Sequence, residues 1–288
     1  MRRLLRHPPA AFGAIVLLLL TALALAAQPL QALLGIDAET LDLAAQLAPA
    51  SSGHPLGTDE VGRDLLARLL SGSQVSLAIG LSTALVAALL GTLVGLLAGY
   101  RGGTVDALLM RLTDGVIALP LLPLLIVLSA VDPAKLGLPA EVLRSPGGGL
   151  ARTVVIIALV GWTTVARLVR AATLSVKSHE FIRAAEALGA GPARIMIRHL
   201  LPNVVSPVIV ATTLSVGNII LLESALSFLG LGVQPPLPSW GNMLSGALDL
   251  LGSAPMLAVW PGLMIFLTVL SFNLVGDGLQ RSLDPRRS

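Results

Sequence analysis

The residue types that most often perform chemistry in proteins are few in this sequence, and they are scattered. The 288-residue chain has no cysteine, which excludes disulfides, thiolate metal sites and cysteine nucleophiles. No histidine belongs to an H-E-x-x-H pair that could hold zinc; the four are His7, His54, His179 and His199. Neither G-x-S-x-G nor G-x-x-x-x-G-K-[ST] occurs, so we find no signature of a serine hydrolase or of an ATP-binding loop.

One group of residues could be drawn as a metal site, namely His54, Asp59, Glu60 and Asp64. A turn followed by a helix explains the same residues, with Thr58 or Asp59 as the cap of a helix that ends near Leu70. We favour the turn and the cap. We therefore expect no metal ion and no cofactor.

The elements that carry these residues must be embedded in lipid. Hydrophobic residues make up 55% of the chain, charged residues only 12%, and the mean hydropathy is +0.86. A soluble domain carries about 25% charged residues, so much of the usual polar surface is missing. The basic residues lie at the ends of apolar segments without interleaved aromatic residues, which argues against nucleic-acid binding.

Six apolar runs predict an all-α, polytopic membrane protein with six transmembrane helices. They are Ala10–Ala27, Val75–Gly99, Gly115–Val131, the run bounded by Arg152 and Arg167, Asn203–Leu222 and Leu250–Gly276. The first run suits a signal peptide as well as a retained span. The uncharged stretch Ser224–Leu248 contains Gly230, Gly232, Pro235, Pro236 and Pro238, so we read it as a helix end followed by a re-entrant or surface-lying connection.

Basic residues favour cytoplasmic N- and C-termini for this six-span arrangement. Fourteen fall in the inside segments: Arg2, Arg3, Arg6, Arg101, Arg111, Arg167, Arg170, Lys177, Arg183, Arg194, Arg198, Arg281, Arg286 and Arg287. Five fall in the outside segments: Arg63, Arg68, Lys135, Arg144 and Arg152. Asp277 and Arg281, spaced i, i+4, predict an ion pair at the inner end of the last span.

The second span has a face of small residues at steps of three or four: Ser76, Gly80, Ala84, Ala88, Gly91, Gly95 and Gly99. Such a face lets another helix backbone approach closely. Three polar residues could line a solute path or form helix–helix hydrogen bonds: Asn218, Glu223 and Asn242. For Glu223, a wet interfacial position is the alternative to a partner or a cavity.

The inside segment between residues 174 and 203 predicts a helix, a turn and a second helix. Ser178 is the expected N-cap, with Glu180 in the first turn. One apolar face is formed by Phe181, Ala184, Ala185 and Leu188. Gly189 suits the left-handed position that ends the first helix, and Pro192 suits the start of the second. This face could lie on the membrane, pack on its own protein or dock into a partner.

This segment resembles the coupling loop of ABC-importer permeases, the loop that docks on the ATPase subunits. The matching residues are Ala184, Ala185, Gly189, Leu201 and Pro202. Arg183 stands where the family has a glutamate, and His199 where it has an isoleucine. The resemblance extends the expected docking surface to Phe181 and Leu188.

Four further segments narrow the resemblance to the C-type permease subunit of dipeptide, oligopeptide and related nickel importers. They are HPLGTDEVGRDLLARLLSG, AGYRGGTVDALLMRLTD, LSFLGLGVQPPLPSWG and FNLVGDGLQRSLDP. The resemblance implies a type I ABC-importer permease fold in the bacterial inner membrane, with the first span retained. It also implies four kinds of partner: a B-type permease, two cytoplasmic ATPases, an external solute-binding protein and a peptide-like solute. A nickel or other small-solute permease of the same group is the alternative.

The expected organisation is an anchor over 1–28, an external segment over 29–72, a permease domain over 73–277 with the coupling loop at 176–202, and a cytoplasmic tail over 278–288. An intramembrane enzyme is disfavoured because no histidine lies in a span and no aspartate lies mid-span. A pure scaffold would not need the Gly- and Pro-broken segment, which is typical of transporters.

Overall fold

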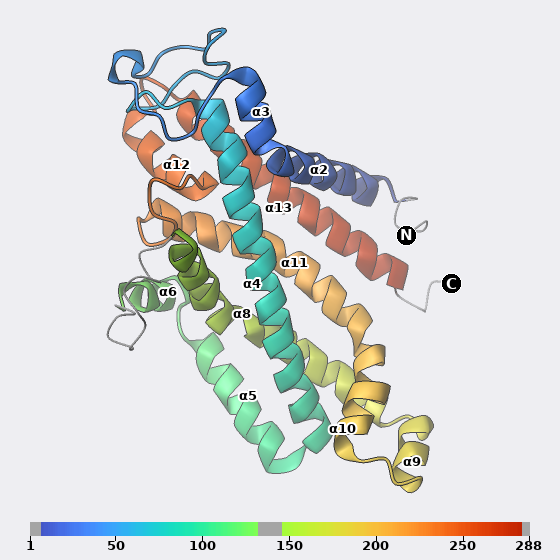
Figure 1. Ribbon diagram of the computed structural model, residues 1–288. Coiled ribbons are helices and arrows are strands. Elements are labelled where there is room, and N and C mark those ends of the chain that lie inside the picture. Colours follow the sequence, from blue (N-terminus) through green and yellow to red (C-terminus); the bar gives the residue numbers. More distant parts are fainter. Residues whose placement is uncertain (1–6, 132–145, 284–288) are drawn as a thin grey trace.

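The computed structural model describes residues 7–131 and 146–283, which are helical and contain no strand (Figure 1). The helices are α2 (Pro8–Leu25), α3 (Ala27–Leu34), η1 (Leu43–Ala45), α4 (Leu65–Arg101), α5 (Gly103–Ala118), α6 (Leu121–Ala130), α8 (Pro146–Lys177), α9 (Glu180–Ala187), α10 (Pro192–Arg194), η3 (Ile195–Leu200), α11 (Leu201–Phe228), α12 (Trp240–Ala247), η4 (Leu248–Leu250) and α13 (Met256–Leu283). The all-α prediction is confirmed. Seven of the basic residues counted above lie outside the described residues, namely Arg2, Arg3, Arg6, Lys135, Arg144, Arg286 and Arg287, as does the end of the expected tail.

Five continuous helical stretches are long and apolar enough to cross a membrane: α2, α4, α8, α11 with the turns that precede it, and α13. A sixth crossing would require α5 and α6 together, as a bent pair, because the two short helices meet at 91°. The prediction of one helix over Gly115–Val131 is therefore wrong. Leu119 is extended, with φ −80° and ψ 138°. It precedes Pro120, whose ring disfavours a helical conformation in the residue before it.

The helix α4 runs through the centre of the molecule and packs on α8 and α11 (Figure 1). A Cβ added to Gly91 would lie 2.6 Å from the Trp162 carbonyl oxygen, and one added to Gly80 would lie 2.6 Å from Cγ1 of Ile220. The close approach predicted from the small-residue face is confirmed. Since helices of the same chain cover this face, it is not free for a second subunit.

Asp64 sets the beginning of α4. Its Oδ1 accepts a hydrogen bond from the Ala67 amide at 2.8 Å, which makes Asp64 the N-cap. The predicted caps, Thr58 and Asp59, are instead used within the preceding turn; Oδ1 of Asp59 accepts from the Arg63 amide at 2.9 Å. No helix ends near Leu70, because α4 continues through it, and the expected boundary at residue 73 lies inside α4.

The N-terminal end of α2 and the C-terminal end of α13 lie side by side, so the two described ends of the chain are adjacent (Figure 1). Nη1 of Arg281 is 2.7 Å from Nε2 of His7. The predicted ion pair between Asp277 and Arg281 does not form within the described residues. Arg281 contacts the start of the first span instead.

The stretch from 224 to 248 is no seventh span, as predicted. The helix α11 ends at Phe228, and Gly230 follows with a φ of +74° that favours glycine. An irregular segment then leads to the eight-residue helix α12. Ser227 Oγ accepts a hydrogen bond from the Val233 amide at 3.0 Å, which satisfies part of the irregular backbone inside the protein.

Candidate functional site: the α9 loop and the polar residues of the spans

The helix α9 lies at the end of the molecule opposite α3 and α12 (Figure 1). His179 occupies the N-cap position without a side-chain cap, whereas Ser178 Oγ donates to the Ser175 carbonyl at 2.7 Å. The prediction of Ser178 as N-cap is therefore wrong. Gly189 does adopt the left-handed conformation, with φ +82°. Its amide donates to Glu186 O at 2.9 Å and the Ala190 amide to Ala185 O at 3.0 Å, as in a Schellman motif.

Ile182 attaches α9 to the rest of the protein. Its side chain is 1% exposed and belongs to a cluster that contains Ile195, Leu200 and Val204. Ile182 lies off the predicted apolar face and was therefore not among the predicted docking residues. The sequence contains one indication of this contact. Phe181 and Ile182 are adjacent, and adjacent residues in a helix point to different sides, so this short helix has apolar residues on two sides.

The predicted apolar face points away from the chain. Leu188 is 88% exposed and Phe181 is 44% exposed, while Ala184 is exposed and Ala185 half-buried. This face therefore does not pack on its own protein, which leaves lipid or a partner as the surface that it meets. An outward apolar face of this kind is typical of a helix that docks in a groove.

The second helix of the loop begins at Pro192, as predicted, and continues through α10 and η3 into α11. The six residues of η3 have π-helical geometry. Leu201 and Pro202 follow directly and are half-buried and exposed, respectively. Because Pro202 has no amide hydrogen, the regular bond to the carbonyl four residues earlier is missing, and the wider turn accommodates its ring.

Two polar contacts fix the end of α8 that leads into α9. Arg170 binds Asp106 through two hydrogen bonds of 2.5 and 2.6 Å. Lys177 Nζ donates to the Tyr100 carbonyl, at the end of α4, at 2.5 Å. These contacts join the last turn of α4 and the first turn of α5 to the C-terminal part of α8, so the segment that leads into α9 is held rigidly.

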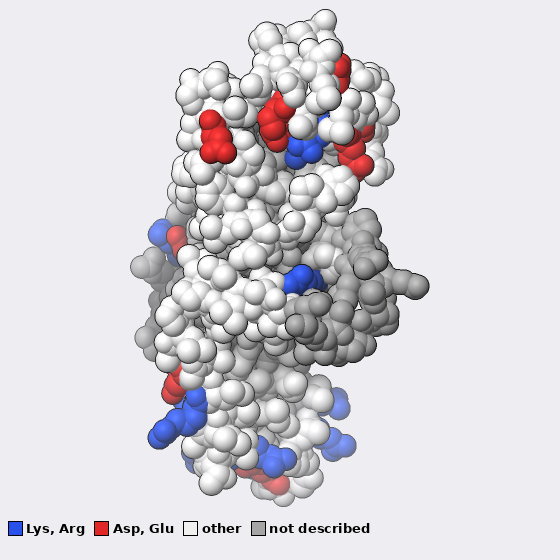
Figure 2. Space-filling view, turned by 90° about the vertical axis from the view of Figure 1, so that its left-hand side faces the viewer, with Lys and Arg blue, Asp and Glu red and all other residues white. Residues whose placement is uncertain are grey.

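Charges are distributed unequally between the two ends of the molecule. Figure 2 shows Asp and Glu gathered at its upper end and Lys and Arg prevailing at its lower end. The acidic side chains include Asp37, Glu39, Asp42, Asp59, Glu60 and Asp64, which precede α4. The basic ones include Arg101 at the end of α4 and Lys177, Arg183, Arg194 and Arg198 in and beside the α9 loop.

Glu223 is buried inside the chain. It is 0% exposed and accepts a hydrogen bond from Ser227 Oγ at 2.7 Å, while Ser76 Oγ lies 3.4 Å from its other oxygen. The wet interfacial alternative is therefore wrong. Ser76 also accepts from the Trp240 amide at 3.2 Å, so a residue predicted only as small links α4, α11 and α12.

Asn242 holds the irregular segment together. It forms a capping box with Ser239, and its Nδ2 donates to the Leu237 carbonyl at 2.8 Å. Asn218 lies elsewhere, exposed in a groove of about 470 Å³ between α8, α11 and α13. Polar but uncharged neighbours in this groove are Thr164, Ser206, Ser215 and Gln280. The structure therefore does not bring the three predicted polar residues into one site.

His54, Asp59, Glu60 and Asp64 form no metal centre in the described residues. His54 Nδ1 lies 3.0 Å from Asp64 Oδ2, and Asp59 binds Arg63 at 2.7 Å. The carboxylates are thus engaged by a cap, a turn and basic side chains, in agreement with the turn interpretation.

Comparisons with known proteins identify the group to which this arrangement belongs. Residues 91–288 match the family described as binding-protein-dependent transport system inner membrane component. A glutathione transport system permease protein, GsiD, of Pectobacterium atrosepticum is 41% identical over 99% of this chain and 89% of its own length. GsiD of an Escherichia coli strain is 43% identical over 81% of this chain and 72% of its own length.

A protein of Brucella suis described as a peptide permease is 38% identical over 99% of this chain and 89% of its own length. All three relatives are permease components and none is an enzyme. The match over most of the chain, together with the apolar helices, shows that the protein belongs to the binding-protein-dependent transport system inner membrane component family and is a multi-pass permease of the inner membrane.

Proposed function

We propose that this chain is the C-type permease subunit of an ABC importer for small peptides or peptide-like solutes. The printed functions of its relatives, glutathione and peptide transport, support the solute class. The chain has no phosphate loop of the G-x-x-x-x-G-K-[ST] type, so ATP hydrolysis comes from two partner ATPases. A B-type permease completes the membrane unit, and an external binding protein delivers the solute.

The outward apolar face of α9 is the observation that carries this proposal. It lies at the end of the molecule where basic residues prevail, which supports a cytoplasmic position for this end by the positive-inside rule. Leu188 is 88% exposed in the isolated chain. Burying such a side chain in a partner's groove contributes about 1.5–3 kcal/mol, so a docked ATPase would benefit from this residue.

The remaining predicted coupling residues shape and position this surface. Phe181, Ala184 and Ala185 lie on α9 itself, and Gly189 turns the chain after it. Leu201 and Pro202 begin α11, so a displacement of the loop is passed directly to a membrane-spanning helix. This connection supports alternating access, in which closure of the ATPases moves α9 and with it the spans around the solute path.

The groove at Asn218 is the surface that best supports a path for solute. The Asn218 side chain makes no hydrogen bond to any described residue, so its amide is available to a solute. The neighbouring lining is apolar or polar without charge, which suits a solute with no net charge, such as a zwitterionic peptide. Glu223 and Asn242 support the path less well, because their polar atoms are engaged within the chain.

The docking of α9 can be tested with Leu188→Asp in the complete importer. Since Leu188 is exposed in the chain, the variant should insert and fold normally. Its carboxylate would lie in an apolar groove, and we expect ATPase binding to weaken by about tenfold to a hundredfold or more. The measurements are ATPase co-purification and uptake of a labelled dipeptide into proteoliposomes that also contain the partner permease.

Arg183→Ala is the matched control, because Arg183 lies on the same helix, is also exposed and lies off the apolar face. It should bind ATPase nearly as the unchanged chain does. Gly189→Val should impair coupling by a different route, since φ +82° is strained for a β-branched residue. If Leu188→Asp leaves co-purification and uptake unchanged, α9 rests on lipid and the docking proposal is wrong.

A further inference from the structure

The break between α5 and α6, at Leu119 and Pro120, leaves backbone acceptors without donors. Both residues are extended, and α6 leaves α5 at 91°, so the first amides of α6 do not reach the last carbonyls of α5. Among the described residues, the carbonyl oxygens of Ile117, Ala118 and Leu119 accept no hydrogen bond. These residues and Pro120 are exposed, so no described residue covers the break.

The break lies at membrane depth. Figure 1 shows α5 beside the lower half of α4, beginning where α4 ends. The 16 residues of α5 span about 24 Å from that end. A hydrocarbon core of roughly 30 Å, centred on the roughly 55 Å of α4, extends from about 12 to about 42 Å along that helix. The end of α5 therefore lies inside this core.

Lipid cannot supply the missing donors. It could accept the leucine side chains beside the break, but a backbone carbonyl in hydrocarbon loses the hydrogen bonds that water gives it. Irregular backbone occurs at this depth only where protein covers it or where water reaches it. The break therefore faces either the partner permease or water.

The charges on α5 favour water. Four exposed residues at steps of three or four form the face that ends at the break: Ala107, Arg111, Asp114 and Ala118. Asp114 pairs with Arg167 of α8, and the two side chains remain 55% and 49% exposed. An ion pair so exposed at this depth is favourable only in water. The apolar face of α5, where Leu108 is 72% exposed, lies on another side of the helix and suits lipid.

The same ion pair connects the break to the groove at Asn218. Thr164 and Leu168, one turn apart on α8, line that groove. Arg167 neighbours Thr164 on the exposed face of α8. A water-filled path along the groove would therefore continue over the ion pair to the break.

The chemistry of the break suits a cation. Acceptors prevail, because Pro120 and Pro123 carry no amide hydrogen. The three free carbonyl oxygens lie at the C-terminal end of α5, which is the negative end of its helix dipole. The nearest carboxylate on this face, Asp114, is already paired with Arg167. A primary ammonium group, with its positive charge and three donors, is the complementary ligand.

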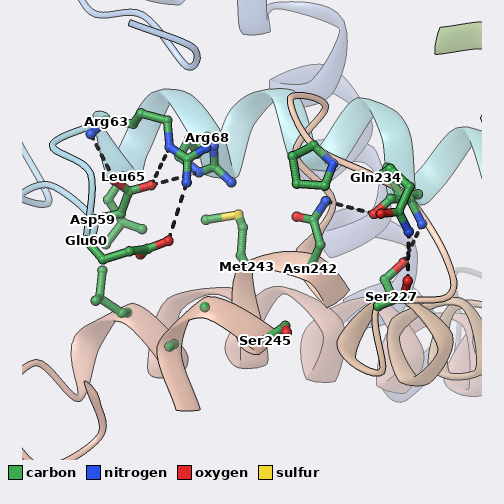
Figure 3. A pocket seen from close by; sticks show the side chains of 16 residues that line it. Asp59, Glu60, Arg63, Leu65, Arg68, Ser227, Gln234, Asn242, Met243 and Ser245 are labelled. Carbon is green, nitrogen blue, oxygen red and sulfur yellow. Dashed lines mark hydrogen bonds and ion pairs between the residues drawn. The ribbon is translucent and has the colours of Figure 1, made fainter. Parts of the chain in front are cut away.

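The charges at the opposite end of the molecule are, by contrast, balanced within the chain. Figure 3 shows Arg63 and Arg68 beside Asp59 and Glu60 in a cavity of about 300 Å³. Oδ2 of Asp59 lies 2.7 Å from Nε of Arg63 and 3.4 Å from Nε of Arg68. A ligand in that cavity would gain no unpaired charge, whereas the acceptors at the break are free.

We propose that the break faces the water-filled solute path and binds the ammonium group of the solute through the carbonyl oxygens of Ile117, Ala118 and Leu119. This inference rests on the proposed function and adds a requirement to it. The permease selects solutes with a free amine over solutes of the same size whose amine is blocked.

A single introduced thiol tests whether the break is wet, because the chain has no cysteine. Ala118→Cys lies at the break, and Leu108→Cys, also exposed on α5, is the matched control on the apolar face. Both are assembled with cysteine-free partner permease and ATPases in nanodiscs and treated with a charged methanethiosulfonate. Since the thiolate is the reactive form and needs water, Ala118→Cys should react at least about tenfold faster than Leu108→Cys. Equal rates would mean that lipid or the partner permease covers the break, and would overturn the proposal.

Protection by two probes tests the ligand. Alanyl-alanine has a free ammonium group, and N-acetyl-alanyl-alanine does not. The binding protein is left out, so that its own preference does not enter the comparison. Alanyl-alanine should slow the labelling of Ala118→Cys, and the acetylated probe should need at least about tenfold higher concentration, because a charge-assisted hydrogen bond is lost. Equal protection by the two probes, or protection by neither, would refute the ammonium site.

Asp114→Asn, added to the Ala118→Cys chain, separates the carbonyl oxygens from the nearest carboxylate. Asp114 is exposed, so the variant should fold, and the preference for alanyl-alanine should persist. Loss of the preference would assign the amine to Asp114 and overturn the proposal. Uptake of alanyl-alanine by the unchanged importer with its binding protein tests the proposed function separately. Uptake without protection of Ala118→Cys refutes only the site at the break, whereas absence of uptake refutes the peptide importer itself.

Discussion

Gly95→Ala tests whether the contact between α4 and α8 is as close as the structure shows. An added Cβ would lie 2.6 Å from the Ala166 carbonyl oxygen, 2.7 Å from the Val169 Cβ and 2.9 Å from the Arg170 amide nitrogen. Ordinary carbon contacts are about 3.5–4.0 Å, so α8 must move by about 1 Å. None of the three atoms is the end of a flexible side chain. Overpacking of this kind costs about 1–3 kcal/mol.

Gly115→Ala is the matched control. It makes the same chemical change in the last turn of α5, where an added Cβ meets nothing within 4 Å. Both variants gain helix propensity, about 1 kcal/mol in a helix interior and less at a helix end, so most of this gain cancels when the two are compared. The free energy of unfolding should therefore be about 1–3 kcal/mol lower for Gly95→Ala than for Gly115→Ala.

The assay is SDS-induced unfolding of the purified full-length chain in mixed micelles, followed by far-ultraviolet circular dichroism. Transport provides a second readout, since α8 leads into α9 and its displacement should impair coupling. Gly115→Ala should transport normally. Equal stability of the two variants would refute the packing argument, because it would mean that the helices are farther apart than the structure places them.

Reporter fusions at His54 should be external and fusions at Ser178 internal; an internal His54 would invert the proposed orientation. Ile182→Ala should release α9 from the rest of the protein, because it removes about 2 kcal/mol of packing. The hydrogen-exchange rates of the α9 amides should then rise roughly thirtyfold or more, and unchanged rates would exclude Ile182 as the residue that anchors α9. Asn242→Ala should destabilise the chain by about 1–2 kcal/mol in SDS unfolding, since it removes the capping box of α12, and Asn203→Ala, exposed on α11, should have less effect.

The features that the sequence predicts correctly depend on local signals. Long apolar runs identify five spans, because a lipid-facing helix needs apolar residues on every side. Gly189 and Pro192 mark the turn after α9, because few other residues suit those backbone positions. The bend at Pro120 had an equally local signal, which the hydropathy of the run concealed.

The features that the sequence leaves open depend on contacts between distant segments. Ile195 and Leu200 determine which side of α9 packs inward, because they form one cluster with Ile182. They belong to η3, so the pattern within α9 itself does not reveal this contact. Arg281 contacts His7 rather than Asp277, because α13 packs beside α2.

The unbroken length of α4 limits how this permease can move. Its 37 residues form a rod of about 55 Å, longer than the roughly 30 Å hydrocarbon core of a bilayer. One end carries Arg68 and the other receives Lys177, the last residue of α8. Because α8 packs closely against the glycines of α4, the two helices must tilt together as one rigid unit. A tilt of about 5° around one end would carry the other end through about 5 Å, so a small rotation at one membrane surface becomes a large displacement at the other.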